Sequence, residues 1–370
     1  MSEAAKPRLV SLDVLRGLTV VGMILVNSMA GMKWGAEATV FPLLLHAHWD
    51  GLMLADLVFP GFLMMVGVAI PLAMATPRPG GQVGPILSRT ARLFLLGFLL
   101  SNLAWFADFS TGDWRLFGVL QRIALAYGAC ALLFLACGPK ARLAILAAIL
   151  VLYWPLTLAP ALDGLPTDIW ARGHNFVASV DRFFLGAGNH MYVTGPEGYD
   201  PEGLLGTLPA IAHGLIGVAI GEYLLRRPAH SARTLALAGA AMLGVGIAWG
   251  FVFPVIKDIW SSTFVLVTCG ITTLALAGLH AWLDAPRPHS AATRGFILFG
   301  SAFGINAIAA YVLHQLTAPM PTWQALLVPF QALRGPLGDG LAAFVPVLLY
   351  IAFLWLCVEY LRRRKWIIKI

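Results

Sequence analysis

The sequence has 370 residues, of which 59% are hydrophobic and only 12% are charged, and its mean hydropathy is +0.79. A soluble domain carries about 25% charged residues, so this composition excludes soluble, fibrous and disordered proteins and predicts that the lipid bilayer is the solvent. A net charge of +7 would fit a nucleic-acid-binding protein only if the basic residues were clustered on a solvated domain. We expect no nucleic-acid partner and assign these residues to cytoplasmic loops.

Ten apolar stretches, separated by charged residues, prolines or glycines, predict membrane-spanning helices, because about 20 apolar residues cross a bilayer. They cover residues 11–32, 52–75, 88–107, 115–137, 141–160, 206–226, 232–253, 261–283, 295–316 and 341–361. The predicted fold is therefore an all-α polytopic membrane protein, with a single domain over residues 1–370.

The lysines and arginines orient these helices. With the N-terminus in the cytoplasm, seventeen of the 25 basic residues fall in cytoplasmic segments, as the positive-inside rule requires. We therefore expect both termini on the cytoplasmic side of a cell's inner (plasma) membrane, and the long loops over 161–205 and 317–340 outside. These loops and the 33–51 segment hold many of the histidines and acidic residues, which favours a polar substrate handled at the external face.

Ionisable and amide side chains at membrane depth are costly, so each is a candidate functional group. Asp13 and Arg16 lie on one helix face and can form either a structural pair or a ligand site. Asn27, near the outer end of the same helix, can equally be a contact between helices. The further candidates at this depth are Asp56, Gln121, Arg122, Asn306 and His314, of which the last two are expected on roughly one helix face.

The densest polar group is the turn His46-Ala47-His48-Trp49-Asp50-Gly51. Its histidines, with Asp50 and Asp56, could hold a metal, but the pattern lacks a convincing third ligand, and we expect no metal. Acid–base chemistry fits better, because imidazole exchanges protons near neutral pH and a neighbouring carboxylate fixes its tautomer. Composition alone leaves a solvated histidine without a chemical role as the alternative.

Nine short segments, spread almost from end to end, form a recognisable series. They are Ser11–Gly17, His46–Gly51, Ala55–Pro60, Gly118–Arg122, Val180–Gly186, His190–Tyr192, Tyr199–Thr207, Lys257–Ser261 and Arg364–Ile370. In this order and spacing they resemble the heparan-α-glucosaminide N-acetyltransferase family of transmembrane acyltransferases, particularly its shorter bacterial members.

The resemblance implies an acyltransferase that moves an acetyl group from cytoplasmic acetyl-CoA to the amino group of a terminal glucosamine-type sugar on the periplasmic side. The family's catalytic histidine matches His46, and its first-helix asparagine matches Asn27. The segment between them is longer than the family pattern, and His48 and Asp50 stand where Ser and Asn are typical. The identity of the acceptor sugar is therefore left open.

The expected mechanism uses His46 as general base on the acceptor amine and Asp56 or Asp50 to orient the imidazole. Asn27 is expected to donate a hydrogen bond to the thioester oxygen. Acetylation of His46 itself is the alternative mechanism. The residues expected to bind the sugar are Asp50, Asp200, Glu202 and His190. Those expected to bind acetyl-CoA are Arg16, Gln121, Arg122, Trp260, Asn306 and His314, with the arginines near the inner mouth to receive its phosphates.

Two further expectations concern partners and the alternative function. A homodimer is expected from the family resemblance. A polytopic sugar or small-molecule permease without acyl transfer is the alternative function, although the sequence shows no internal repeat of the kind found in many transporters.

Overall fold

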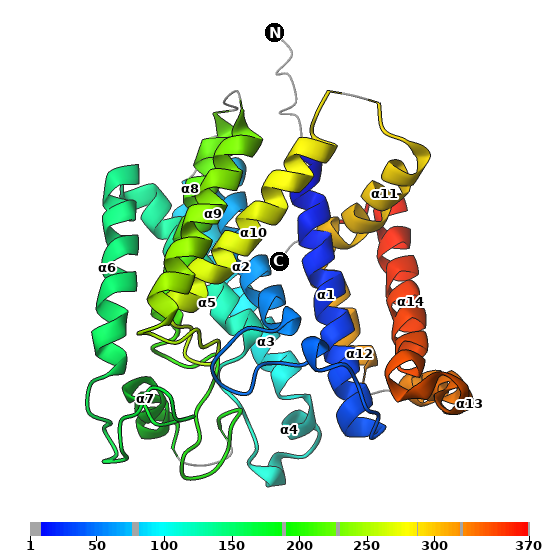
Figure 1. Cartoon of the computed structure of the whole chain (residues 1–370), viewed down its shortest axis with the longest axis horizontal. Coiled ribbons are helices and arrows are strands. Elements are labelled where there is room, and N and C mark those ends of the chain that lie inside the picture. Colours follow the sequence, from blue (N-terminus) through cyan, green and yellow to red (C-terminus); the bar gives the residue numbers. More distant parts are fainter. Residues whose placement is uncertain are drawn as a thin grey trace. The chain divides into compact units, whose positions relative to one another are not determined.

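The computed structural model describes residues 9–75, 81–186, 190–226, 230–286, 288–318 and 321–368, and it is built from helices over these ranges (Figure 1). Nine helices there are long and apolar enough to cross a membrane, and one bent pair of helices makes a tenth candidate span. The predicted all-α polytopic membrane fold is confirmed.

Each predicted span corresponds to an observed one. The straight spans are α1 (Val10–Gly35), η2 with α2 (Leu54–Leu57 and Val58–Met74), α3 (Val83–Ser101), α5 (Val119–Ala136), α6 (Pro139–Thr157), α8 (Thr207–Leu225), α9 (Ser231–Gly250), α10 (Ser262–Leu283) and α14 (Phe344–Arg363). The bent pair is α11 (Ala291–Ile305) with α12 (Ala307–Thr317). The remaining elements are η1 (Pro42–Leu44), α4 (Leu103–Ala107), η3 (Phe109–Thr111), α7 (Phe176–Leu185) and α13 (Pro321–Ala342).

The ninth predicted span is not the single helix expected over 295–316. Helices α11 and α12 meet at 76°, and the break falls at Asn306. The Asn306 side-chain oxygen accepts a hydrogen bond from the Ile368 N–H at 3.2 Å, so a distant segment supports the break. Asn306 therefore lies at the break itself, between α11 and α12, whereas His314 lies within α12.

The two predicted external loops contain helices. Helix α7 lies within 161–205, and α13 occupies most of 317–340 with a kink at Gly338, whose φ is +73°. Hydropathy does not reveal α13 because Pro329, Pro336 and several polar residues interrupt its apolar run.

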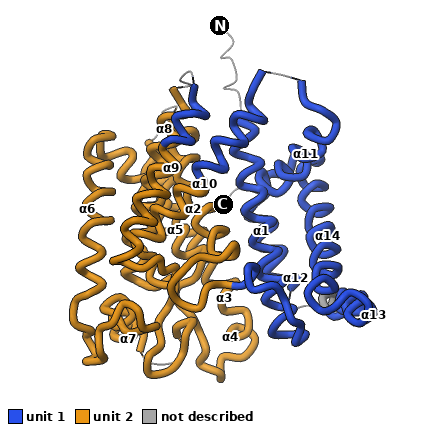
Figure 2. The backbone as a smooth tube through the Cα atoms, viewed as in Figure 1, with its two compact units in different colours: residues 1–45, 230–237, 273–369 blue, residues 46–229, 238–272, 370 orange. Residues whose placement is uncertain are grey.

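The described residues form two compact units, coloured separately in Figure 2. Unit 1 takes its residues from 1–45, 230–237 and 273–369, and unit 2 from 46–229 and 238–272. In unit 1, α1 contacts α11 and α14; in unit 2, α2 contacts α8 and α3 contacts α5. A single functional domain over the whole chain stays a prediction.

Helices α2 and α8 of unit 2 pack closely through small residues. A methyl group added at Gly217 would collide with the Met64 carbonyl, and one added at Gly221 would collide with the Val68 carbonyl. In the contacting pairs Met64–Gly217 and Val68–Gly221, the residue numbers of both helices increase in the same direction. The helices therefore run parallel, and their N-terminal ends are neighbours. Glycines permit such close backbone contact between membrane helices. This packing brings the segment before α2 near the segment before α8.

Candidate functional site

His46 and Asp56 form a hydrogen-bonded pair at the start of the second span. The His46 Nδ1 lies 2.7 Å from Asp56 Oδ1, and Asp56 Oδ2 accepts the N–H groups of Ala47 at 3.1 Å and Met53 at 3.0 Å. The Asp56 side chain is buried, whereas that of His46 is 49% exposed. With Nδ1 engaged by the carboxylate, Nε2 is the ring nitrogen suited to take a proton from a substrate.

Lys257 joins this pair. Its Nζ lies 3.0 Å from His46 Nδ1, 3.4 Å from His46 Nε2 and 3.5 Å from Asp56 Oδ1. An ammonium has three donors and no acceptor, so Lys257 competes with the imidazole N–H for the carboxylate. Lys257 belongs to the Lys257–Ser261 segment of the family resemblance, but the sequence predicts no role for it.

The turn is anchored at its end by backbone pairing. Asp50 and Ile256 form an isolated antiparallel bridge, and the Gly51 N–H donates to the Val255 carbonyl at 2.9 Å. Gly51 has a φ of +102°, which favours glycine. The Asp50 side chain stays exposed, so its carboxylate is accessible.

Trp49 anchors the middle of the same turn. Its indole N–H donates to the Ile169 carbonyl at 3.0 Å, and its ring meets Tyr199 edge-on at 5.8 Å. Both rings belong to a buried cluster that includes Tyr153 and Phe253. His46 thus belongs to a turn that is fixed by burial of its tryptophan.

Trp260 and Arg122 meet next to Lys257. The backbone N–H of Trp260 donates to the Lys257 carbonyl at 2.8 Å, and the Arg122 guanidinium lies over the Trp260 ring at 5.1 Å. The fully buried Arg122 donates from Nη2 to the Gly203 carbonyl at 3.0 Å. Its Nε and Nη1, and the Trp260 Nε1, have no hydrogen-bond partner among the described residues. Buried donors of this kind indicate a place for acceptor oxygens.

The contact of Arg122 bears on two expectations. Gly203 belongs to the 161–205 loop, which we predict to be external, so an external loop and an Arg122 at the inner mouth are not compatible with each other. Its neighbour Gln121 is fully buried and donates to the Leu116 carbonyl at 3.2 Å.

Asp200 and Glu202 are both bound by Arg115, a residue to which sequence reasoning gave no role. Arg115 donates to the two Asp200 oxygens at 2.7 and 2.6 Å, and to Glu202 Oε2. Burial alone would lower the pKa of Arg115, but the two carboxylates hold it above its ordinary value. Burial raises the pKa of Asp200, whereas Arg115 and Arg122 hold that of Glu202 below its ordinary value despite burial. Both expected sugar ligands are thus occupied within the chain.

Asp181, in α7, binds the backbone of the segment that holds Asp200 and Glu202. Its Oδ1 accepts the Leu204 N–H at 2.9 Å, and its Oδ2 accepts the Asp200 N–H at 3.3 Å. Burial, reinforced by the charge of Asp200, raises the pKa of Asp181 to about 7 despite these hydrogen bonds. A methyl group at Gly203 would collide with the Asp181 carboxylate, so this contact requires glycine.

His190 is the third residue of the 161–205 loop that is expected to bind the sugar, and it lies against Trp114. Its Nδ1 is 2.9 Å from the Trp114 carbonyl, and the two ring centroids are 4.2 Å apart. Trp114 directly precedes Arg115, so His190 flanks the Arg115 ion pairs.

The other expected site residues belong to unit 1. Asn27 Nδ2 lies 3.4 Å from His314 Nε2, and His314 Nδ1 lies 3.3 Å from the Tyr350 hydroxyl. Arg16 donates to the Gly304 carbonyl at 3.4 Å. Unit 1 therefore brings Asn27 and His314 together, while His46, Asp56 and Trp260 belong to unit 2.

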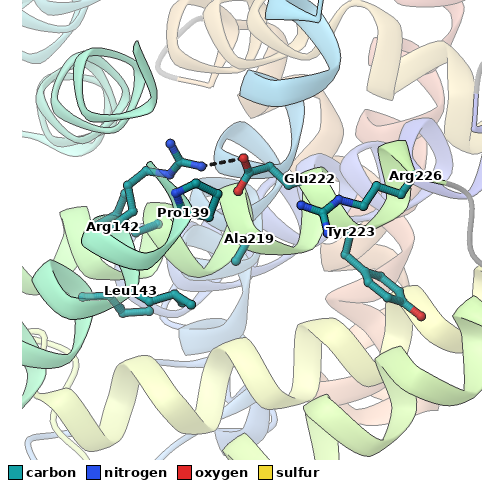
Figure 3. Close-up of a pocket in the computed structure, with 9 residues that line it drawn as sticks. Pro139, Arg142, Leu143, Ala219, Glu222, Tyr223 and Arg226 are labelled. Carbon is teal, nitrogen blue, oxygen red and sulfur yellow. Dashed lines mark hydrogen bonds and ion pairs between the residues drawn. The ribbon is translucent and has the colours of Figure 1, made fainter. Parts of the chain in front are cut away.

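A small pocket of about 170 Å³ lies between α6 and α8 of unit 2 (Figure 3). Arg142 and Glu222 form an ion pair at its edge, and Arg142 also donates to the Phe134 and Cys137 carbonyls at the end of α5. The pocket lies near the C-terminal end of α8. Gly206, which lies against Arg122, directly precedes the opposite end of this helix. No histidine lines the pocket, and its Arg142 and Glu222 side chains are bound to each other. Among the described residues, no three His, Cys, Asp or Glu side chains are grouped to hold a metal.

Comparison with known proteins identifies the family. A family model described as heparan-alpha-glucosaminide N-acetyltransferase, catalytic, matches residues 8–244, which is more than half of the chain. The chain belongs to the heparan-alpha-glucosaminide N-acetyltransferase family.

Two curated relatives carry the name of this family. The heparan-alpha-glucosaminide N-acetyltransferase of Homo sapiens is 27% identical over 98% of the chain, and that of Mus musculus is 26% identical over 97%. The chain spans 60% of the length of each relative. The heparan-alpha-glucosaminide N-acetyltransferase match includes His46, Asp56 and Arg122 and ends before Lys257.

Proposed function

We propose that this chain is a membrane N-acetyltransferase that moves an acetyl group from acetyl-CoA to the amino group of a terminal glucosamine-type sugar. The names of the human and mouse relatives support N-acetyl transfer to a glucosaminide. The observation that supports it most is the bond between His46 Nδ1 and the buried Asp56, because it prepares Nε2 as a general base.

In the proposed reaction the sugar amine attacks the carbonyl carbon of the thioester. A C–N bond forms as the C–S bond breaks. His46 Nε2 takes the proton from the nitrogen and returns it to the leaving thiolate, which gives free CoA and a neutral imidazole. Asp56 keeps the imidazole in the required tautomer and stabilises the imidazolium. Asn27 is proposed to donate a hydrogen bond to the thioester oxygen as negative charge develops there.

The donor is proposed to lie beside Arg122 and Trp260. Their three buried N–H donors without a partner among the described residues fit the carbonyl oxygens of an acyl-pantetheine chain. Lys257 and Trp260 belong to one short turn, so this position adjoins His46. Gln121, Arg16, Asn306 and His314 remain proposed donor contacts.

The acceptor sugar is proposed to bind at the external face. The exposed carboxylate of Asp50 is available for its ammonium or hydroxyl groups. Asp200 and Glu202 are proposed to act by holding the loop through Arg115, and His190 by bordering it. A membrane position with both termini in the cytoplasm, and a homodimer, belong to the same proposal.

The first test replaces His46 and Asp56 in the purified full chain, supplied with acetyl-CoA and glucosamine. His46→Ala should lower kcat at least about 10³-fold, and Asp56→Asn about 10²- to 10⁴-fold, because the base is lost or wrongly protonated. The matched control is His48→Ala, an exposed histidine of the same turn, which should keep kcat within about twofold. Turnover retained by a folded His46→Ala variant would contradict the proposed mechanism.

Kinetic, trapping and transport measurements distinguish direct attack from the two alternatives, an acetyl-His46 intermediate and a permease. Parallel double-reciprocal plots and a trapped acetyl-His46 without acceptor would replace direct attack by a two-step mechanism. Sugar uptake into vesicles with the thioester left intact would instead support the permease.

A further inference from the structure

Ser231, His280 and Asp284 form a hydrogen-bonded chain in unit 1, separate from the residues of the proposed acetyltransferase. Ser231 Oγ lies 2.7 Å from His280 Nε2, and His280 Nδ1 lies 2.8 Å from Asp284 Oδ2. Ser231 begins α9, while His280 and Asp284 lie at the end of α10. A hydroxyl, a base and an orienting carboxylate within these distances are the arrangement of an activated nucleophile.

Asp284 is held firmly in its orienting position. Its Oδ1 accepts the N–H groups of Val10 at 2.8 Å and Ser11 at 3.2 Å, and its Oδ2 accepts the Ser11 hydroxyl. Burial alone would raise the pKa of Asp284, but hydrogen bonds from His280 and Ser11 hold it below its ordinary value. An ionised Asp284 keeps a proton on His280 Nδ1, so Nε2 is left to accept the proton of the Ser231 hydroxyl.

The backbone around Ser231 supports the same chemistry. His230, directly before it, has a φ of +62°, a conformation that non-glycine residues adopt at a cost and that occurs often at functional sites. The first N–H groups of a helix have no partner within that helix, and the helix dipole favours negative charge there. Donors at the start of α9 are thus placed to stabilise an oxyanion beside Ser231. Ser231 and His280 are both half-buried rather than fully enclosed.

We propose that Ser231 is a second nucleophile, which takes acyl groups from esters or thioesters and passes them to water. Ser231 Oγ attacks the acyl carbon while His280 Nε2 takes the hydroxyl proton. A C–O bond forms, the bond to the leaving alkoxide or thiolate breaks, and His280 returns the proton to that group. Water, deprotonated by His280, then cleaves the acyl-serine, releasing a carboxylic acid and restoring Ser231.

A fluorophosphonate probe tests the nucleophile directly in the purified full chain. Mass spectrometry should locate the label on Ser231 in the folded protein. Labelling should be lost in Ser231→Ala and slowed at least tenfold in His280→Gln. The matched control is Ser290→Ala, which removes a hydroxyl that caps α11 by accepting the Thr293 N–H. That variant should be labelled like the original chain.

Hydrolysis of p-nitrophenyl acetate gives a second readout. Ser231→Ala should lose it, whereas His46→Ala should keep it, and Ser231→Ala should still acetylate glucosamine if the proposed function holds. Failure of the two proposals is therefore distinguishable. A folded original chain without label on Ser231, or equal labelling of the His280→Gln variant, would overturn the inference; the residues would then serve only to join α1, α9 and α10.

Discussion

Single residues of the site find their partners at very different distances along the chain. Asp56 follows His46 by ten residues, so a neighbouring carboxylate was predictable from the turn itself. Lys257 reaches the same histidine across 211 residues, and Arg115 reaches Asp200 across 85. No local sequence pattern predicts such pairs, because they form only when the helices pack.

The raised pKa of Asp181 makes stability depend on pH. Its ordinary pKa of 3.8 applies to the unfolded chain, whereas burial raises the folded value to about 7. Between these values the unfolded chain loses a proton that the folded chain retains, so the stability that Asp181 contributes at low pH falls as pH rises. The difference corresponds to roughly 4 kcal/mol at most.

Asp181→Asn should remove this dependence. Apparent Tm in detergent, measured from pH 4 to pH 8, should fall less steeply for the variant than for the original chain. Loss of one acceptor lowers its Tm at low pH, so the slope is the decisive quantity. Parallel curves for the two proteins would show that Asp181 does not titrate in this range.

Among the elements, the spans were predictable and their interruptions were not. Runs of about twenty apolar residues suffice to locate membrane helices. At the break, Asn306 bonds to Ile368, which comes from beyond α14, and a hydropathy pattern contains no such information. Helix α13 was missed for a related reason, because prolines and polar residues dilute its apolar run.

The crossing of α2 and α8 should be sensitive to a single methyl group. Gly217→Ala would push the helices apart at the Met64 carbonyl and should destabilise the protein by about 1–3 kcal/mol. Gly244→Ala is the matched control, because its methyl would meet no atom within 4 Å, and alanine gains up to about 1 kcal/mol in helix propensity. Unfolding by detergent titration measures both. Equal effects of the two substitutions would refute close packing at Gly217.

The whole molecule combines a predictable membrane pattern with a division that the sequence does not mark. Hydropathy and charge predicted a polytopic protein because they report the surrounding solvent. The two compact units were not predicted, since α9 and α10 each contribute residues to both units. Which residues share a unit is a property of the folded chain.

The predicted orientation can be tested with two exposed positions. In a background without the four native cysteines, Pro166→Cys and Lys140→Cys are treated with a membrane-impermeant maleimide. Intact bacterial cells should label Pro166→Cys, while Lys140→Cys should react only after lysis, because basic connections are retained inside. The reverse pattern would invert the topology and remove the proposed path from cytoplasmic donor to external sugar.

The bend between α11 and α12 has a consequence for the bilayer itself. A helix interrupted within a span exposes main-chain polar groups, and lipid tolerates these only where protein covers them. Just after α14 the chain turns at Lys365, whose φ is +59°, and the Ile368 N–H then bonds to Asn306. Asn306 itself is fully buried, so protein rather than lipid surrounds the bend at this residue, as a broken span in a bilayer requires.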